Sequence, residues 1–369
     1  MGSAKLTLIV QDDYNIRVER DDGAQTRGKL ILDDLHRNLI SLFEDWLSRE
    51  KQSGQDRKMS RRWEFEVFGT LLYKVLFDGQ VEIFFRQTLE EVKEGERLRV
   101  QLSFEGRSSD LASIPWEYLY FPDTEYRRGF FLATDVNLVL SRYMPLEIAR
   151  QNLAPTEGPL RILIVVSKPQ DLGPVISDGV IEPIQKLAET NPTTIDILNK
   201  PTLDNFLDKL DETRPHVLHF IGHGQFNKAE GKGEIALLSN DETNARWLGD
   251  RDFTDFLIRR RSIPRLAFLH LCESGTIDFT ANFAGLAPQL VRAGIPAVVA
   301  MQYPISNNAA IIFSRAFYRE LAKGEPVDTA VQEGRYRITT NDDKAYDSRV
   351  FATPVLYMRS RDGVIQPPY

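Results

Sequence analysis

Apolar and polar residues alternate along the first part of this chain in the manner of an α+β domain. Tyr14, Ile16 and Val18 repeat with the period of two that is typical of a half-buried strand. Two apolar helical patterns between 65 and 92 are interrupted at Asp78-Gly79. We expect strands at 6–10, 14–19, 98–104 and 137–143 around these helices.

A further helical pattern runs from Leu30 to Trp46. Its apolar residues recur at helical spacing and share one side of the expected amphipathic helix: Leu32, Leu35, Leu39, Leu42, Phe43 and Trp46. The polar stretch 48–60 that follows is expected to form an exposed loop.

From residue 160 the pattern changes to short apolar runs that alternate with helical patterns. The expected strands are 161–167, 194–198, runs beginning at 217 and 266, 297–302 and 351–359. The expected helices are 180–189, 203–211, 279–293, 309–323 and 326–338. This alternation predicts an α/β fold whose mostly parallel sheet is sandwiched by helices. Residues 144–159 have the composition of a linker, so we place domains at 1–150 and 158–369.

Composition narrows the class of protein. The chain has 369 residues, of which 42% are hydrophobic and 27% charged, with a net charge of -7. These values are typical of a globular chain of about two domains, and they argue against nucleic-acid binding through overall basicity. No apolar segment approaches the roughly 20 residues that span a bilayer, and no signal peptide opens the chain. With a single cysteine, the sequence predicts a reducing cytoplasm and no membrane partner.

Two of the apolar runs end in side chains that perform chemistry. Val217–Gly224 ends in His223-Gly224, and the run that starts at Leu266 reaches Cys272, the only cysteine. Ligands and chemistry collect at the carboxyl ends of strands in open α/β sheets, where we place both residues. A neighbouring imidazole lowers the pKa of a cysteine thiol and can later protonate a leaving amine. The sequence therefore predicts a His-Cys dyad.

Catalysis on a carbonyl also requires donors for the oxyanion. The backbone N–H groups of Gly224 and Cys272 are the candidates, because a glycine lets a substrate carbonyl approach its amide. The order along the chain is informative as well. His223 precedes Cys272 by about 50 residues, the separation typical of caspases, whereas papain-like proteases place cysteine first.

Several blocks of sequence resemble the CHAT family of caspase-like cysteine peptidases, in the clan of caspases, metacaspases and separase. The blocks are Phe220-Ile221-Gly222-His223-Gly224, Cys272-Glu273-Ser274-Gly275, Ala300-Met301-Gln302-Tyr303-Pro304-Ile305, Phe317-Tyr318-Arg319-Glu320-Leu321 and Thr353-Pro354-Val355-Leu356-Tyr357, with Ile114-Pro115-Trp116-Glu117-Tyr118-Leu119 and Phe131-Leu132-Ala133-Thr134 upstream. Together they cover nearly the whole chain.

The resemblance implies an endopeptidase that needs no cofactor or metal, with His223 as general base and acid and Cys272 as nucleophile. It implies that 158–369 is the catalytic subdomain and 1–150 an accessory or degenerate caspase-like one. CHAT proteins are mostly bacterial and often serve defence or signalling, fused to sensor or repeat modules. We therefore expect a protein substrate and an activating module in cis or in trans, since no such module is visible here.

Substrate preference is less defined. Metacaspases usually have an acidic residue two positions before the cysteine, but this chain has His270 there, so a preference for Lys or Arg is not supported. Asp171 and Asp178 are candidates for a negative pocket, although aspartate in a turn is ordinarily a loop carboxylate. Met301 and Gln302 are expected to border the cleft, on a strand able to pair with an extended substrate.

Other readings of the same residues stay open. A caspase-fold scaffold that binds partners without proteolysis is the main alternative to the peptidase, and an acyltransferase or deamidase would use the same dyad. Cys272 alone would be an ordinary buried apolar residue. A zinc site made of His216, His219, His223 and Cys272 is disfavoured, because residues along one strand alternate between its two faces.

Overall fold

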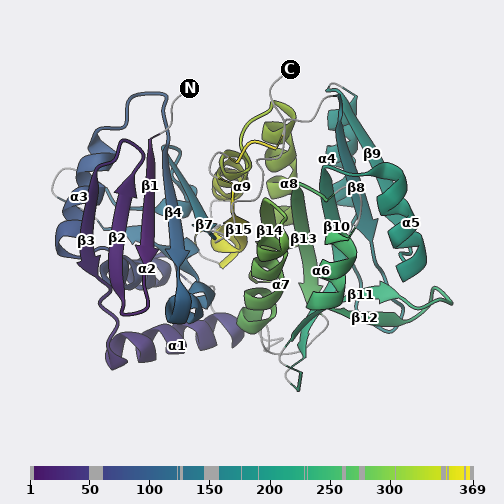
Figure 1. Ribbon diagram of the computed structural model, residues 1–369, viewed down its shortest axis with the longest axis horizontal. Coiled ribbons are helices and arrows are strands. Elements are labelled where there is room, and N and C mark those ends of the chain that lie inside the picture. Colours follow the sequence, from purple (N-terminus) through teal and green to yellow (C-terminus); the bar gives the residue numbers. More distant parts are fainter. Residues whose placement is uncertain are drawn as a thin grey trace. The chain divides into compact units, whose positions relative to one another are not determined.

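The computed structural model describes residues 4–49, 61–122, 124, 128–144, 158–175, 177–189, 191–227, 229–230, 232–259, 263–273, 279–303, 305–341, 346, 349–360 and 363–365. The chain divides into two compact units. The first unit comprises 1–143 and 335–352, and the second comprises 144–334 and 353–369. Figure 1 shows the elements of both units. Most of the expected linker at 144–159, and the expected loop from residue 50 onward, lie outside the described residues.

The first unit contains a mixed sheet of five strands in the order β7-β4-β1-β2-β3. Strand β4 (Leu98–Phe104) is parallel to both β1 (Lys5–Val10) and β7 (Leu138–Tyr143). Strands β2 (Asn15–Arg20) and β3 (Gln25–Lys29) complete an antiparallel meander. The four predicted strands are confirmed. Strand β3 had no apolar pattern, because this edge strand alternates only between exposed and half-buried positions.

The first unit contains the helices α1 (Asp34–Arg49), α2 (Arg62–Leu76) and α3 (Gly79–Glu90). The two predicted helical patterns are confirmed, with their break next to Asp78. Short elements line the rest of this core: η1 (Gly106–Ser113), η2 (Trp116–Tyr118), β5 (Tyr120–Phe121), β6 (Phe130–Phe131) and η3 (Leu132–Thr134). Gly69 lets α2 approach them, because a Cβ there would lie 2.1 Å from the Tyr118 carbonyl oxygen.

Only part of the apolar side predicted for α1 packs inward: the Phe43 ring stacks on Phe68, with centroids 3.9 Å apart, and Trp46 lies near Phe65. Leu35, Leu39 and Leu42 are exposed, at 63%, 41% and 65% of their surface, whereas Ile40 and Leu47 are buried. The helix has two adjacent apolar arcs at helical spacing, and only the one on the Ile40 side packs inward. The helical pattern alone does not indicate which of the two arcs packs against the core.

A late stretch of the chain returns to the first unit. Helix α9 (Val327–Asn341) belongs to the second unit up to Gly334 and to the first from Arg335. The fully buried Arg335 donates from Nη1 to the Leu140 carbonyl at 3.0 Å. Phe351, in η5 (Arg349–Ala352), packs edge-on against Tyr118 with ring centroids 5.4 Å apart. The first unit is therefore made of two separate stretches of the chain, rather than the single continuous range that was expected.

The second unit contains the mostly parallel sheet that the sequence predicts. Strands β9 (Thr193–Asn199), β8 (Leu160–Val166), β10 (Val217–Asn227), β13 (Leu266–Glu273) and β14 (Ala297–Met301) are parallel neighbours in that order. Antiparallel β15 (Pro354–Met358) follows β14. The hairpin of β11 (Lys232–Leu238) and β12 (Ala245–Gly249), which the sequence analysis did not identify, pairs antiparallel with the end of β10.

Helices cover both faces of this sheet. On one face, Phe220 of β10 packs near Phe253 of α6 (Asp250–Ile258), which packs near Phe206 of α5 (Leu203–Thr213). Helix α7 (Phe279–Ala293) packs against α6 on this side. On the other face, His219 of β10 contacts Tyr318 of α8 (Asn307–Ala322), and α8 packs against α4 (Asp178–Ala188). The prediction of a helix-covered sheet is confirmed, although α6 was not anticipated.

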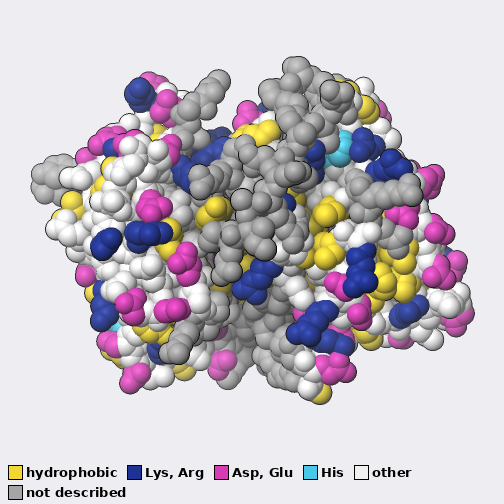
Figure 2. Space-filling model, viewed as in Figure 1, with side chains coloured by type: hydrophobic (Ala, Val, Ile, Leu, Met, Phe, Trp, Pro, Cys, Tyr) yellow, Lys and Arg dark blue, Asp and Glu magenta, His cyan; other side chains and the backbone are white. Residues whose placement is uncertain are grey.

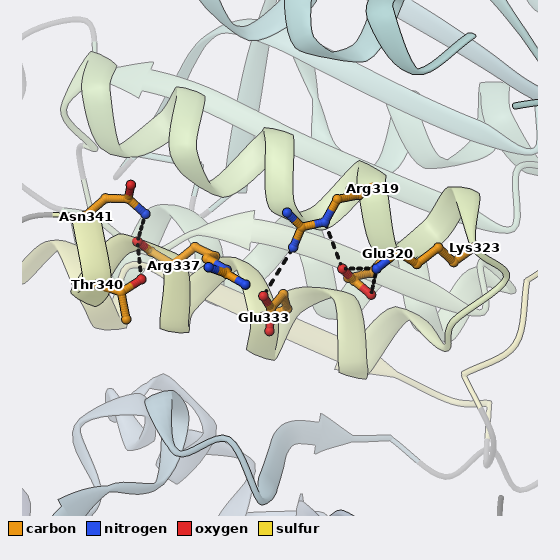
Figure 3. Close-up of polar contacts among 7 residues, drawn as sticks. All are labelled: Arg319, Glu320, Lys323, Glu333, Arg337, Thr340 and Asn341. Atoms are coloured by element: carbon orange, nitrogen blue, oxygen red, sulfur yellow. Dashed lines mark hydrogen bonds and ion pairs between the residues drawn. The ribbon is translucent and has the colours of Figure 1, made fainter. Parts of the chain in front are cut away.

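Helices α8 and α9 are joined by an ion-pair network within the second unit. Arg319 donates from Nε to Glu320 at 3.0 Å and from Nη2 to Glu333 of α9 at 3.2 Å, and Lys323 also reaches Glu320 (Figure 3).

Elsewhere, acidic and basic side chains are interspersed over the face shown in Figure 2. None of the helices in the described part of the chain is both long and apolar enough to cross a bilayer.

Candidate active site

His223 and Cys272 occupy neighbouring strands of the second unit. Strands β10 and β13 are parallel, and their register pairs residue 223 with residue 272. Neighbouring strands lie about 5 Å apart, and directly paired positions share a face of the sheet. The two positions selected from the sequence are therefore adjacent. The side chain of Cys272, and Ser274 and Gly275 of its motif, lie outside the described residues.

The location of His223 on its strand differs from the prediction. Strand β10 does not end there but continues to Asn227. Its parallel pairing with β8 ends at Ile221, and antiparallel pairing with β11 begins at Gly224. His223 therefore lies at the point where β10 exchanges one partner for another, beside the loop that follows β8. The hairpin explains the difference, because it extends β10 beyond the parallel part of the sheet.

Glycines on either side of His223 permit this crowded junction. A Cβ on Gly222 would lie 2.8 Å from Cε1 of Phe220 and 3.1 Å from Cβ of Ser167, at the start of the loop after β8. A Cβ on Gly224 would lie 2.8 Å from Cδ1 of Leu271 on β13. Both contacts are closer than side chains ordinarily make. The Gly222-His223-Gly224 sequence therefore fits the close packing of neighbouring chain around the imidazole.

The imidazole of His223 is held in one orientation. It is 1% exposed, and its Nε2 lies 2.8 Å from the carbonyl oxygen of Gly173, in the loop after β8. A carbonyl oxygen only accepts, so Nε2 is the nitrogen that bears the proton. Nδ1 is then the basic nitrogen of the neutral ring, and it is buried without a hydrogen-bond partner among the described residues. This is the arrangement in which a base is oriented by a third group.

The remaining candidates from the sequence occupy different environments. Asp171 is exposed, and its Oδ1 accepts a hydrogen bond of 2.8 Å from the backbone N–H of Ala245. Asp178 begins α4 with a carboxylate that is 96% exposed; it accepts from the Ser177 hydroxyl and lies 3.9 Å from Lys168 Nζ. The two aspartates are therefore bound to separate parts of the loop region.

His270, Met301 and Gln302 are buried, at 3%, 0% and 8% exposure. Burial lowers the pKa of His270 to about 4, so this imidazole is neutral at physiological pH. Met301 pairs with Pro354 of β15, and the Gln302 N–H donates to the Thr353 carbonyl at 2.9 Å. One edge of this segment is therefore already occupied by β15.

Two contacts made by the histidines of β10 were not predicted from the sequence. The Gly173 carbonyl is a backbone atom, and no side-chain pattern marks it. Tyr318 lies within a family block, but its contact with Nδ1 of His219 at 2.9 Å depends on how α8 packs on the sheet. His219 itself is fully buried. Across the described residues, no three His, Cys, Asp or Glu side chains gather as a metal site requires.

Comparison with protein families identifies the family of this chain. A family model described as the CHAT domain matches residues 67–358, which is most of the chain. No curated protein gives a significant match to this chain.

Comparison with solved structures shows the fold. Separase of Saccharomyces cerevisiae, in its complex with securin, aligns with a TM-score of 0.51 at 13% identity, over 97% of this chain and 30% of that chain. RgpB of Porphyromonas gingivalis, in a complex of its pro- and mature domains, aligns at 14% identity with a TM-score of 0.47, over 90% and 78%. The Drosophila initiator caspase Dronc aligns at 10% identity with a TM-score of 0.36, over 61% and 91%. The separase match places the chain among caspase-like folds.

Proposed function

This chain belongs to the CHAT domain family, and we propose that it is a cysteine endopeptidase with His223 as general base and acid and Cys272 as nucleophile. It would cleave a protein partner in the cytoplasm, in bacterial defence or signalling, under the control of an activating sensor or repeat module. The first unit would be an accessory or degenerate peptidase subdomain.

One observation supports this proposal above the others. Residue 272 is paired with residue 223 in the register of β10 and β13, while His223 Nε2 is bonded to the Gly173 carbonyl. The bond at Nε2 leaves Nδ1 as the nitrogen able to take a proton. A nucleophile next to a base that a third group orients is the arrangement expected for nucleophilic catalysis.

The reaction follows from these roles. Nδ1 of His223 would take the thiol proton of Cys272, and the thiolate would attack the scissile carbonyl carbon. Backbone N–H groups of Gly224 and Cys272 would donate to the oxyanion. The imidazolium would then protonate the leaving amine as the C–N bond breaks, which gives a thioester and a free amino terminus. Water, deprotonated by the same imidazole, would hydrolyse the thioester and restore the thiol.

His270, Met301 and Gln302 would border the substrate from strands β13 and β14 and the residue after β14. The neutral state of His270 would favour an uncharged side chain over Lys or Arg at the nearest substrate position, since a buried cation needs a counter-charge.

A covalent trap tests the proposal. We expect an electrophilic peptide ketone to add once to the protein, at Cys272, as measured by intact mass and peptide mapping. Labelling should disappear in Cys272→Ala and fall by at least about a hundredfold in His223→Ala, because general base catalysis is typically of that size. His36→Ala, which removes a partly exposed imidazole of α1, is the matched control and should label like the wild type.

Cleavage is tested separately from reactivity. Candidate partners incubated with the protein should acquire new amino termini in mass spectrometry, and Cys272→Ala should not produce them. A partner whose mass changes without cleavage would instead indicate acyl transfer or deamidation. Absence of labelling at Cys272 with every activating partner tested would contradict the peptidase and leave a scaffold.

A further inference from the structure

The loop that presents the Gly173 carbonyl to His223 is attached to the β11–β12 turn at two points. Gln170 donates its backbone N–H to the Thr243 carbonyl at 2.8 Å. One residue later, Oδ1 of Asp171 accepts the backbone N–H of Ala245 at 2.8 Å. The first contact requires no particular side chain, whereas the second depends on the Asp171 carboxylate. Asp171 therefore provides the side-chain attachment of this part of the loop.

The turn that receives these bonds is held in shape by hydrogen bonds of its own. The Asp241 carboxylate accepts the Ser239 hydroxyl at 2.5 Å, the Thr243 hydroxyl at 2.7 Å and the Thr243 N–H at 3.2 Å. Glu242 takes a left-handed conformation, with φ of 58°, and its N–H donates to the Ser239 carbonyl at 2.9 Å. Such local side-chain bonds fix a turn in one shape. The turn is therefore a firm support for a neighbouring loop.

The distance along the chain from this attachment to the imidazole is short. Only Leu172 separates Asp171 from Gly173, and the Leu172 N–H donates back to the Pro169 carbonyl at 3.4 Å. Pro174 follows and restricts Gly173 toward extended backbone. Any displacement of Asp171 is therefore transmitted over two residues to the carbonyl that lies 2.8 Å from His223 Nε2.

We propose that Asp171 is a positioning residue: its bond to the Ala245 N–H anchors the loop, so that the Gly173 carbonyl holds His223 with its proton on Nε2. This assignment replaces a pocket for basic substrate side chains as the role of Asp171. Its consequence for catalysis rests on the peptidase function proposed above. The state of the imidazole does not, and it can be measured without any substrate.

Nitrogen-15 NMR of histidine-labelled protein tests the placement directly. The chain has five histidines, so their ring signals can be assigned by substitution. We expect the wild type to show His223 as a single Nε2–H tautomer, and Asp171→Ala to show tautomer exchange or a mixture. Asp171→Asn keeps the acceptor oxygen and should restore the wild-type pattern. Unchanged His219 and His270 signals would show that each variant is folded.

Matched controls separate anchoring from loss of charge. Asp208→Ala removes an exposed carboxylate from α5 of the same unit and should leave His223 unchanged. Ala245→Pro removes the donor while Asp171 remains, at the first position of an edge strand, where proline is tolerated. It should reproduce Asp171→Ala, and the double variant should add nothing further, since both break one bond. A His223 signal that Asp171→Ala leaves unchanged would overturn the proposal.

Kinetics then measure the consequence. One hydrogen bond contributes about 1 kcal/mol, so we expect kcat to fall about fivefold in Asp171→Ala with KM unchanged, and Asp171→Asn to recover it. A rise in KM with kcat unchanged would indicate a substrate pocket and contradict positioning. If the wild type cleaves no peptide, the NMR result still decides the role of Asp171, and only the peptidase function fails.

Discussion

The Tyr318 hydroxyl of α8 lies 2.9 Å from Nδ1 of His219 on β10, and both side chains are fully buried. The His219 ring stacks on Phe268 of β13, with centroids 4.2 Å apart and planes 3° from parallel. Burial sets the pKa of His219 well below its ordinary value and that of Tyr318 well above, so the pair is neutral. Because His219 lies four residues before His223 on the same face, this contact supports the strand that presents the candidate base.

Tyr318→Phe should destabilise the protein. The substitution removes one hydroxyl and leaves a buried imidazole nitrogen without a partner, which costs about 1–3 kcal/mol. Urea unfolding should show the loss in the second unit. Tyr336→Phe, on the half-buried side of α9, is the control and should change stability by less than about 0.5 kcal/mol. An equal effect of the two variants would show that the His219 contact contributes nothing.

Buried neutral histidines predict acid sensitivity. Burial lowers the pKa of His270 to about 4 in the folded protein, against about 6.5 in the unfolded chain. Between pH 4 and pH 6.5 the unfolded state binds more protons than the folded state. The stability that the neutral His270 contributes is therefore present above about pH 6.5 and is lost as the pH falls toward 4. Between pH 7 and 5 we expect the wild type to lose about 2 kcal/mol more than His270→Gln in urea unfolding.

Urea unfolding of the wild type and of His270→Gln, each at pH 5 and at pH 7, provides the comparison. A His270→Gln variant with the wild-type slope would show that His270 does not remain neutral on folding.

The sheet of the second unit was predictable because its central strands are buried on both faces. Such strands appear in the sequence as continuous apolar runs, as at 162–166 and 266–269. The prediction failed where that signal is absent or divided. Strand β3 is a polar edge, and α1 has two apolar arcs of which only one is buried.

Only those parts of the candidate site that have characteristic side chains could be predicted from the sequence. The histidine-glycine and cysteine blocks identify residues 223 and 272, and the parallel register of β10 and β13 brings these positions together. The Gly173 carbonyl could not be found, because every residue has a carbonyl and its direction depends on the fold of a loop. The bond between Asp171 and Ala245 joins residues far apart in sequence, so a single sequence does not indicate it.

Removing one partner of a buried ion pair should strongly destabilise the first unit. Glu117 and Arg142 are 1% and 3% exposed, with bonds of 2.5 Å and 3.0 Å between them, and Arg335 lies 4.0 Å from Glu117. Glu117→Gln would leave buried guanidinium groups without this carboxylate, which costs about 3–5 kcal/mol. Glu66→Gln breaks a pair with Arg62 that is only half-buried and should cost less than about 1 kcal/mol in urea unfolding. Similar losses in both would contradict the role of burial.

Gly69→Ala should also destabilise the first unit. The added Cβ would lie 2.1 Å from the Tyr118 carbonyl oxygen and 2.7 Å from Cβ of Tyr120, and neither atom can move without its backbone. Overpacking of this kind costs about 1–3 kcal/mol. Gly249→Ala is the control, because its Cβ would meet only the flexible Lys232 side chain at 3.3 Å. Thermal unfolding should separate the two variants by several degrees, and equal melting temperatures would contradict the close approach of α2.

Gly224→Ala should reduce activity more than stability, if the function proposed above is correct. Its Cβ would lie 2.8 Å from Cδ1 of Leu271, the end of a side chain that can rotate away, so folding should lose no more than about 2 kcal/mol. The proposed oxyanion donor, however, is the Gly224 N–H, which alanine retains but shields with its methyl group from an approaching substrate carbonyl. Loss of access to one such donor reduces kcat by about a hundredfold. Peptide hydrolysis and urea unfolding of the same preparation provide the comparison. A variant with normal kcat and reduced stability would assign Gly224 to packing and require another donor for the oxyanion.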